Sequence, residues 1–115
     1  MDWKKKTPPD EAENDVLKDI IRKLIGVFNP ERVVLFGSRA KGTAEADSDF
    51  DLLVVAQTTD PVHVRMAKAQ RALRGVNASV DVFVCTPNEA ALYGTWLSHT
   101  IAVALREGIV VHARS

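Results

Sequence analysis

The sequence predicts a small α/β domain of the α+β type: a small mixed β-sheet flanked by helices, with the helices on one side of the sheet. Short apolar runs that are typical of buried strands alternate with longer segments whose apolar residues recur at helical spacing. Capping and turn residues separate the two kinds of segment. The chain has 115 residues, of which 46% are hydrophobic and 26% are charged, which favours one globular domain over residues 1–115.

The first expected element is a long helix near the N-terminus. Apolar residues recur at helical spacing over residues 16–28, and Asn29 and Pro30 end the pattern. Residues 1–13 are mostly polar, and we expect them to form a flexible N-terminal segment.

Capping residues predict two later helices. Asp60 is expected to cap a helix that has Pro61 at its first position and Gly75 after its last turn. Residues 86–89 read Thr-Pro-Asn-Glu, which is a capping box that opens another helix. A third helical pattern over residues 97–105 is closed by Gly108.

Apolar runs between these helices predict the strands. The runs are short and carry β-branched and aromatic residues, as buried strands do. Strands are therefore expected at residues 33–36, 50–55, 80–85 and 109–111.

Charge and composition exclude several classes of protein. Lysine and arginine together number 15, as do aspartate and glutamate, so the formal net charge is zero. Long nucleic acids are usually bound by a basic surface, so we expect no long nucleic acid as a partner. We also expect a cytoplasmic protein with no membrane partner, because no apolar run approaches the roughly 18 residues of a membrane span.

Gly37 and Ser38 follow the first predicted strand directly. Glycine permits a sharp turn and a close approach to a ligand, and backbone amides in such a turn can bind phosphate oxygens. Ser38 adds a hydroxyl donor, and Arg39 and Lys41 bring positive charge nearby. These four residues are candidate nucleotide-binding residues, although many Gly-Ser turns only connect two elements.

Asp49 and Asp51 enter the second strand two positions apart, so their side chains point to the same face. Neighbouring carboxylates repel each other, and a divalent cation removes that conflict. Mg²⁺ suits carboxylate and phosphate oxygens together. Two Mg²⁺ ions about 4 Å apart could activate an attacking hydroxyl and stabilise a leaving pyrophosphate.

Asp81 is a carboxylate within the apolar third strand. Burial of an unpaired charge costs free energy, so a carboxylate within such an apolar strand is unusual. If the third strand lies beside the second, Asp81 completes the site as a metal ligand or as a base for the acceptor hydroxyl. The structural alternative places Asp49 and Asp51 at a solvated strand entrance and Asp81 at an exposed edge.

The combined pattern resembles a known family. The strings GSRAKG at residues 37–42 and SDFDLLVV at residues 48–55, followed by Asp81, resemble the DNA polymerase beta-like nucleotidyltransferase superfamily. They are most similar to its smallest members, the minimal nucleotidyltransferase (MNT) domains. With the ending REGIVVHA at residues 106–113, the resemblance covers nearly the whole chain.

The resemblance implies a nucleotidyltransferase fold and a set of residue roles. Gly37 and Ser38 would hold the triphosphate of ATP or another NTP. Asp49 and Asp51 would ligate two Mg²⁺ ions, and Asp81 would be the third carboxylate. MNT domains are often encoded beside a HEPN-domain toxin, which they neutralise as antitoxins by adenylylating a tyrosine, so the resemblance implies such a partner and acceptor.

Two other functions remain open from the sequence. The chain could neutralise its partner by contact without catalysis, or it could modify a small aminoglycoside-like alcohol. A partner chain or a second copy of this chain would supply the acceptor surface that so short a domain lacks, which makes a homo-oligomer conceivable. A series of basic residues has the pattern of a solvated helix face that could also dock an acidic partner: Arg65, Lys68, Arg71 and Arg74.

Overall fold

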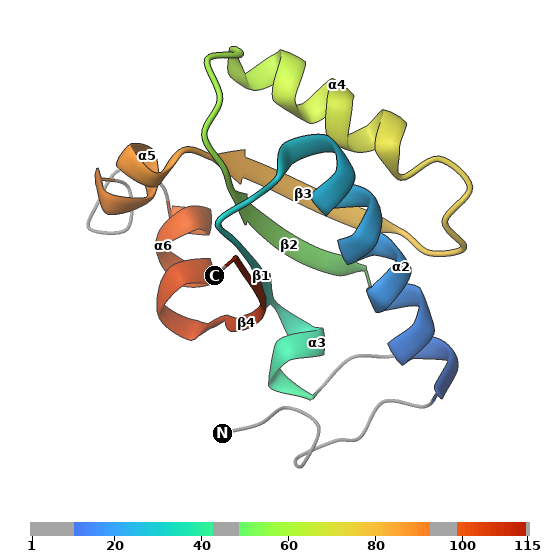
Figure 1. The fold of residues 1–115 in the computed structure, drawn as a ribbon. Coiled ribbons are helices and arrows are strands. Elements are labelled where there is room, and N and C mark those ends of the chain that lie inside the picture. The colour runs from blue at the N-terminus through green and yellow to red at the C-terminus, as the bar shows by residue number, and fades with distance from the viewer. Residues whose placement is uncertain (1–10, 43–48, 93–98, 115) are drawn as a thin grey trace.

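The computed structural model describes residues 11–42, 49–92 and 99–114 and shows a four-stranded sheet between two layers of helices (Figure 1). Residues 1–10 of the predicted flexible segment and residues 97–98 of the predicted helix over 97–105 lie outside the described residues. In chain order the elements are α2 (Glu11–Phe28), β1 (Arg32–Phe36), α3 (Ser38–Lys41), β2 (Phe50–Val55), α4 (Val62–Ala72), β3 (Val80–Cys85), α5 (Pro87–Leu92), α6 (His99–Glu107) and β4 (Ile109–Ala113).

The sheet is mixed and its strands lie in the order β3-β2-β1-β4. β1 runs antiparallel to β2 and to β4, whereas β2 and β3 run parallel. The register places Asp51 of β2 beside Phe36 of β1 on one side and beside Asp81 of β3 on the other. A mixed sheet flanked by helices confirms the predicted fold class.

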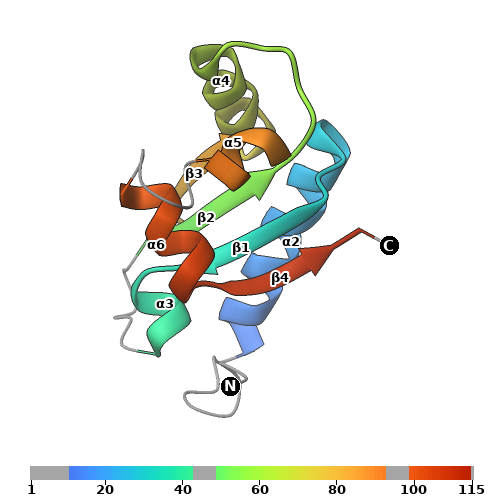
Figure 2. The same cartoon turned by 90° about the vertical axis from the view of Figure 1, so that its left-hand side faces the viewer.

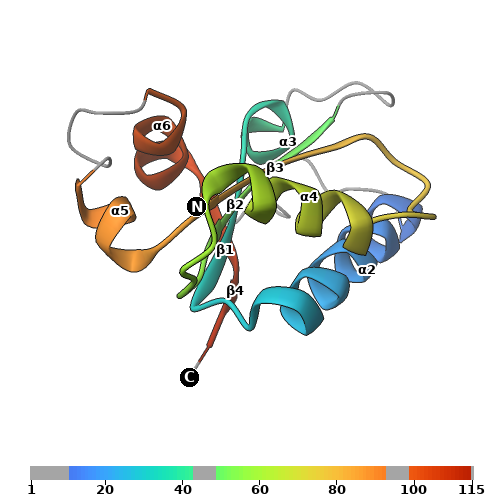
Figure 3. The same ribbon diagram turned by 90° about the horizontal axis from the view of Figure 1, so that it is seen from above.

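Helices cover both faces of the sheet, and the expectation that they lie on one side was wrong (Figure 2 and Figure 3). α2 and α4 pack on one face, while α5 and α6 pack on the other. The reason is visible in β2, where Leu52 belongs to the first core cluster and Leu53 to the second, both with 0% exposure. A strand that buries successive apolar residues needs cover on both of its faces.

The strand predictions agree closely with the structure. β2 and β3 have the predicted bounds, β1 begins one residue earlier at Arg32, and β4 extends two residues further to Ala113. Successive residues of each strand are buried on opposite faces of the sheet, so the strands are nearly continuously apolar. Short apolar runs in the sequence therefore located them well.

The helix predictions need two corrections. α2 begins at Glu11, so residues 11–13 are helical and do not belong to a flexible segment. Pro61, with φ −65° and ψ 161°, is the N-cap of α4, and Asp60 does not cap it. The Asp60 carboxylate instead pairs with Lys68 of the same helix, because an exposed cation lies within its reach.

The predicted capping box of α5 is confirmed. The Thr86 amide donates to Glu89 Oε1 at 2.9 Å, and the Glu89 amide donates to Thr86 Oγ1 at 3.1 Å. Each side chain thus satisfies a backbone donor that the first helical turn leaves unpaired. None of the described helices is both long and apolar enough to cross a membrane.

Candidate active site

The turn after β1 depends on a glycine. Gly37 has φ 75° and ψ −155°, a conformation that is essentially confined to glycine. A Cβ atom at this position would lie 2.3 Å from Oδ2 of Asp51. The missing side chain therefore lets the Asp51 carboxylate lie directly against the turn backbone.

The short helix α3 follows this turn and ends at Gly42. Gly42 adopts the left-handed conformation, with φ 76° and ψ 18°, and its amide donates to the carbonyl oxygen of Ser38. The predicted Gly-Ser turn is thus a compact strand–turn–helix unit, and it holds Ser38 at the end of β1 next to the start of β2.

The three predicted acidic residues gather at the start of β2 and β3. Asp51 and Asp81 are directly paired in the parallel register, so they share a face of the sheet, and neighbouring strands lie about 5 Å apart. Asp49 comes two residues before Asp51, just before β2 begins. Asp51 is half-buried, while Asp49 and Asp81 are exposed.

The surroundings of Asp51 disfavour the ionised form of its carboxyl group. Burial raises the pKa of the Asp51 carboxyl above its usual range, and the negative charges of Asp81 and Asp49 raise it further. Both residues are therefore close enough to Asp51 for their charges to repel its carboxylate. A bound cation would relieve this repulsion.

A divalent metal ion fits the cluster in donor type. Carboxylate oxygens are the ligands that Mg²⁺ prefers, and it keeps further positions for substrate phosphates and water. Within residues 11–42, 49–92 and 99–114, however, no three His, Cys, Asp or Glu side chains are spaced to hold a metal ion by themselves.

The two predicted basic residues take different positions. The Arg39 guanidinium lies 4.0 Å from the centre of the Phe50 ring, so it sits over the residue between Asp49 and Asp51. Lys41 Nζ lies 3.7 Å from Glu107 Oε1 in an exposed ion pair, which binds it only weakly to α6. Arg39 is therefore held over Phe50, whose ring points to the opposite face of the sheet from Asp51, whereas Lys41 leans toward α6.

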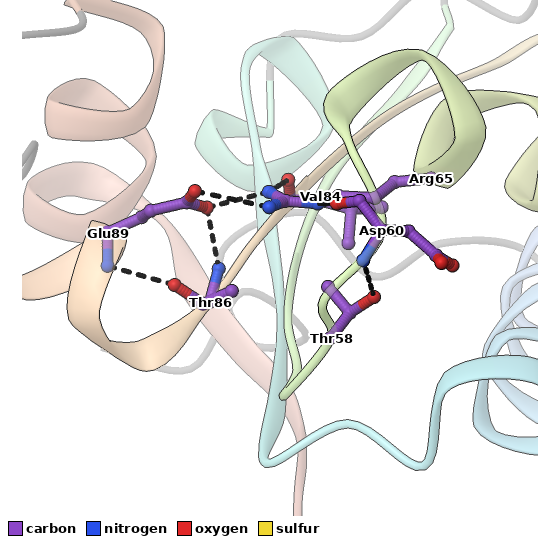
Figure 4. Close-up of polar contacts among 6 residues, drawn as sticks. All are labelled: Thr58, Asp60, Arg65, Val84, Thr86 and Glu89. Atoms are coloured by element: carbon purple, nitrogen blue, oxygen red, sulfur yellow. Dashed lines mark hydrogen bonds and ion pairs between the residues drawn. The ribbon is translucent and has the colours of Figure 1, made fainter.

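A second charged cluster, which the sequence did not reveal, lies at the opposite end of β3 (Figure 4). Arg65 Nη1 donates to Glu89 Oε1 at 2.7 Å and Nη2 donates to Oε2 at 3.2 Å. The same side chain donates to the carbonyl oxygens of Val84 at 3.3 Å and Asp60 at 2.8 Å. Hydrogen bonding to Arg65 lowers the pKa of Glu89 despite partial burial.

Arg65 therefore corrects one prediction. It was grouped with a solvated basic face, yet it is only 7% exposed. Arg65 lies one helical turn before Ala69, which is buried on the same side of α4. This spacing was a weak sign that Arg65 is buried as well. The pairing with Glu89 had no local signal, because the two residues are 24 positions apart.

Comparison with solved structures shows a shared fold. A protein of Sulfolobus solfataricus assigned to the nucleotidyltransferases is 27% identical, with a TM-score of 0.63 over 87% of this chain and 79% of its own. A toxin–antitoxin structure with AMP-PNP is 22% identical, with a TM-score of 0.62 over 84% of this chain and 73% of its own. A mutant MntA–HpeT toxin–antitoxin structure is 24% identical, with a TM-score of 0.54 over 89% and 72%.

Comparison of the sequence with protein families gives the decisive result. No curated protein matches it significantly. The profile of the nucleotidyltransferase domain matches residues 15–103, which include the turn and all three acidic residues. The chain therefore belongs to the nucleotidyltransferase domain family.

Proposed function

We propose that this chain transfers a nucleoside monophosphate, AMP from ATP, onto a hydroxyl group of a partner protein and thereby acts as an antitoxin. The observation that carries the proposal is the direct pairing of Asp51 with Asp81 beside the Gly37 turn. Family membership supplies the reaction class. The nucleotide, the metal and the acceptor are the parts that the experiments below test.

The Gly37 turn is proposed to bind the triphosphate. Because this residue has no side chain, phosphate oxygens can approach the backbone of the turn closely. Ser38 offers a hydroxyl donor from the following residue. Arg39, two residues after Gly37 and held over Phe50, offers positive charge to the phosphates.

The acidic cluster is proposed to hold Mg²⁺ and to manage the acceptor proton. Asp49 and Asp51 would be the ligands, and bound Mg²⁺ would offset the charge that builds on the phosphates. The acceptor oxygen forms a bond to the α-phosphorus, the bond from that phosphorus to the β-phosphate oxygen breaks, and pyrophosphate leaves. Asp81, which is more exposed than Asp51, accepts the proton of the acceptor hydroxyl.

The antitoxin role rests on likeness to known complexes. Two of the solved structures that share the fold are toxin–antitoxin structures, and one of them contains AMP-PNP, an ATP analogue. The sequence resemblance to MNT domains points in the same direction and implies a HEPN-domain toxin whose tyrosine is the acceptor. We therefore place the acceptor hydroxyl on a tyrosine of such a toxin.

Transfer of labelled AMP tests the proposal. The chain is mixed with ATP labelled at the α-phosphate, Mg²⁺ and the protein encoded by the neighbouring gene, and a labelled adduct on that protein is expected. Asp49→Asn with Asp51→Asn should reduce labelling by at least about a hundredfold, while Asp15→Asn on the exposed surface of α2 should leave it unchanged. Binding of ATP without any labelled adduct would count against the transferase.

Neutralisation by contact is the second candidate. It is supported by the likeness in fold to two toxin–antitoxin structures. It predicts that the Asp49→Asn, Asp51→Asn double variant still protects cells from the toxin. Loss of protection by a well-folded double variant excludes it and supports catalysis.

A further inference from the structure

β4 forms an open edge of the sheet that the described residues build. Its neighbour in that sheet is β1, and it lies at the opposite edge from β3 (Figure 2). Natural proteins often blunt such edges with charged side chains, lysine above all, or with proline, but Ile109–Ala113 contains no lysine, arginine or proline. The side of β4 away from β1 therefore offers backbone N–H and C=O groups with which a further strand can pair.

An apolar cleft lies beside this edge, between β4 and α2. It measures about 300 Å³ and is lined by Lys18, Ile21, Arg22, Ile25 and Val111, which we call the edge cleft. Its three apolar residues are only half-buried. The flank of α2 thus lies over an edge strand, where one more strand in the sheet would complete the burial of these side chains.

The other face of β4 is apolar as well. Val110 is 51% exposed and pairs with Val34 of the second core cluster, so it lies on the face that α5 and α6 cover. Val111 packs against the first core cluster, on the face of α2. Because successive residues of an extended segment point to opposite faces, a segment paired with β4 would cover both valines. A compact ligand in the edge cleft would cover only Val111.

The charge around the edge cleft is positive. Lys18 and Arg22 line the cleft and are exposed, and the exposed Arg114 directly follows β4. Arg22 pairs with Asp19, but Asp19 also pairs with Lys23, so positive charge remains in excess. An occupant with negative charge beside its apolar residues would complement this surface.

We propose that β4 and the edge cleft bind an extended segment of another protein, in which apolar residues are flanked by acidic ones. The segment pairs with β4 as a fifth strand, as in other cases of recognition by strand addition. The inference goes beyond the proposed function and does not depend on it. The acidic cluster lies at the start of β2 and β3, and β1 separates these strands from β4.

Two observations favour such a segment over a second copy of this chain. An antiparallel pair of β4 strands related by a twofold axis would place Lys18 and Arg22 of both copies on the same face of the joined sheet, where like charges repel. β4 also carries a bulge, because its register with β1 shifts between Val33 and Val34. A bulge bends its strand, and a flexible segment follows that bend more easily than the edge of a second folded sheet.

A titration of the full-length, ¹⁵N-labelled chain tests the proposal without nucleotide or metal. The probe is a capped peptide in which an alternating run of valine and threonine is flanked by two glutamates on each side. Amide signals of residues 109–113 and 18–25 are expected to shift, whereas those of β3 should not.

Two changes in the probe test its charge and its backbone. Replacing the glutamates by lysines should weaken binding at least about tenfold. Two adjacent prolines at the centre of the peptide should weaken it at least about tenfold as well, because one of the two positions has to donate a hydrogen bond to β4.

Matched charge reversals separate the edge cleft from the rest of the surface. Lys18→Glu with Arg22→Glu should weaken binding of the glutamate peptide about fivefold at low ionic strength. Arg71→Glu with Arg74→Glu makes the same change of charge at exposed positions of α4 and the turn after it. This control should change binding less than about twofold.

A matched pair on α2 tests the apolar wall. Ile25→Ala removes part of the wall and should weaken binding about threefold. Val27→Ala truncates an exposed side chain of the same helix that does not line the edge cleft, and it should leave binding unchanged.

The proposal is overturned if the shifts are absent or fall on other elements, or if the charge-reversed Lys18 and Arg22 variant binds the glutamate peptide as well as the parent does. It is also overturned if amides of residues 109–113 shift with protein concentration alone, because a second copy would then occupy the edge. Should a variant lose its fold, the comparison of the glutamate and lysine peptides decides, since it leaves the protein unchanged.

Asp49→Asn with Asp51→Asn separates this inference from the proposed function. The double variant should lose AMP transfer and bind the peptide as the parent does. If the peptide binds at β4 but the parent transfers no AMP, the docking surface stands and the transferase proposal fails. If the parent transfers AMP but β4 shows no shifts, the transferase proposal stands and the docking surface is wrong.

Discussion

The two ends of β3 carry charge in opposite ways. At its end, the buried Arg65 is matched by Glu89 and by two backbone carbonyl groups (Figure 4). At its start, Asp81 stands beside Asp51, and burial, followed by the charges of Asp81 and Asp49, raises the pKa of the Asp51 carboxyl. The buried charge at the end of β3 is paired with groups of the same chain, whereas several negative charges lie together at its start.

This difference separates stability from function. A buried charge that is fully hydrogen-bonded fixes the elements around it, and here it joins α4, β3 and α5. A cluster of like charges costs stability in the free protein and is relieved only when a cation binds. We therefore expect substitutions at the end of β3 to affect folding most, and those at its start to affect ligand binding most.

Arg65→Met should have the largest effect on stability. It deletes the hydrogen bonds to Glu89, Val84 and Asp60 and leaves Glu89 without its partner, at an expected cost of about 3 kcal/mol in the free energy of unfolding. Urea denaturation measures this cost. Arg71→Met on the exposed side of α4 is the control and should change stability by less than about 0.5 kcal/mol, and equal effects of the two would show that the network contributes nothing.

Gly37→Ala should have the next largest effect. The new Cβ would meet the Asp51 carboxylate and would force alanine into a conformation reserved for glycine, at a cost of about 2 kcal/mol. Because the turn is the proposed triphosphate site, ATP binding measured by calorimetry should fall as well.

Gly26→Ala in α2 is its matched control. Apart from its chain neighbours and the backbone of its own helix, no described atom lies within 4 Å of the site for its Cβ. Alanine favours a helix, so this variant should gain about 0.5 to 1 kcal/mol. A Gly37→Ala protein as stable as Gly26→Ala would contradict the close packing of Asp51 against the turn.

Glu89→Gln should have a smaller, pH-dependent effect. Arg65 lowers the pKa of Glu89 below its usual value near 4.5, so the pair stabilises the native state above that value and loses the contribution as pH falls through the folded pKa. At neutral pH the substitution should cost about 1 kcal/mol. Below the folded pKa the difference in unfolding free energy between the two proteins should shrink, and a difference that is constant with pH would refute the assignment.

Asp51→Asn should have the smallest effect on stability and the opposite sign. Burial and then the charges of Asp81 and Asp49 raise its pKa above 3.8. The free energy of unfolding therefore falls as the pH rises through the folded pKa, because the folded protein then carries an ionised carboxylate that its surroundings disfavour. Asparagine removes that charge, and we expect a gain of about 0.5 kcal/mol at neutral pH. Thermal unfolding with and without Mg²⁺ measures it, and Mg²⁺ should raise the Tm of the parent but not of the variant.

The elements that the sequence predicted well have local causes. The bounds of β2 and β3 follow from unbroken apolar runs, and the capping box at Thr86 and Glu89 follows from side chains three residues apart. The spacing of Asp49 and Asp51 likewise placed both carboxylates at one strand entrance. Asp60 failed as a cap because an alternative partner, Lys68, was available in the folded helix.

The sequence by itself determined the strands, the glycine turn and the types of charged side chain at the candidate site, because each depends on neighbours along the chain. Tertiary structure decided which strands pair, and therefore that Asp51 lies beside Asp81. It also decided that helices cover both faces and that Arg65 is buried against Glu89, 24 residues away. These outcomes depend on burying both faces of one sheet at once, and no single segment carries that constraint.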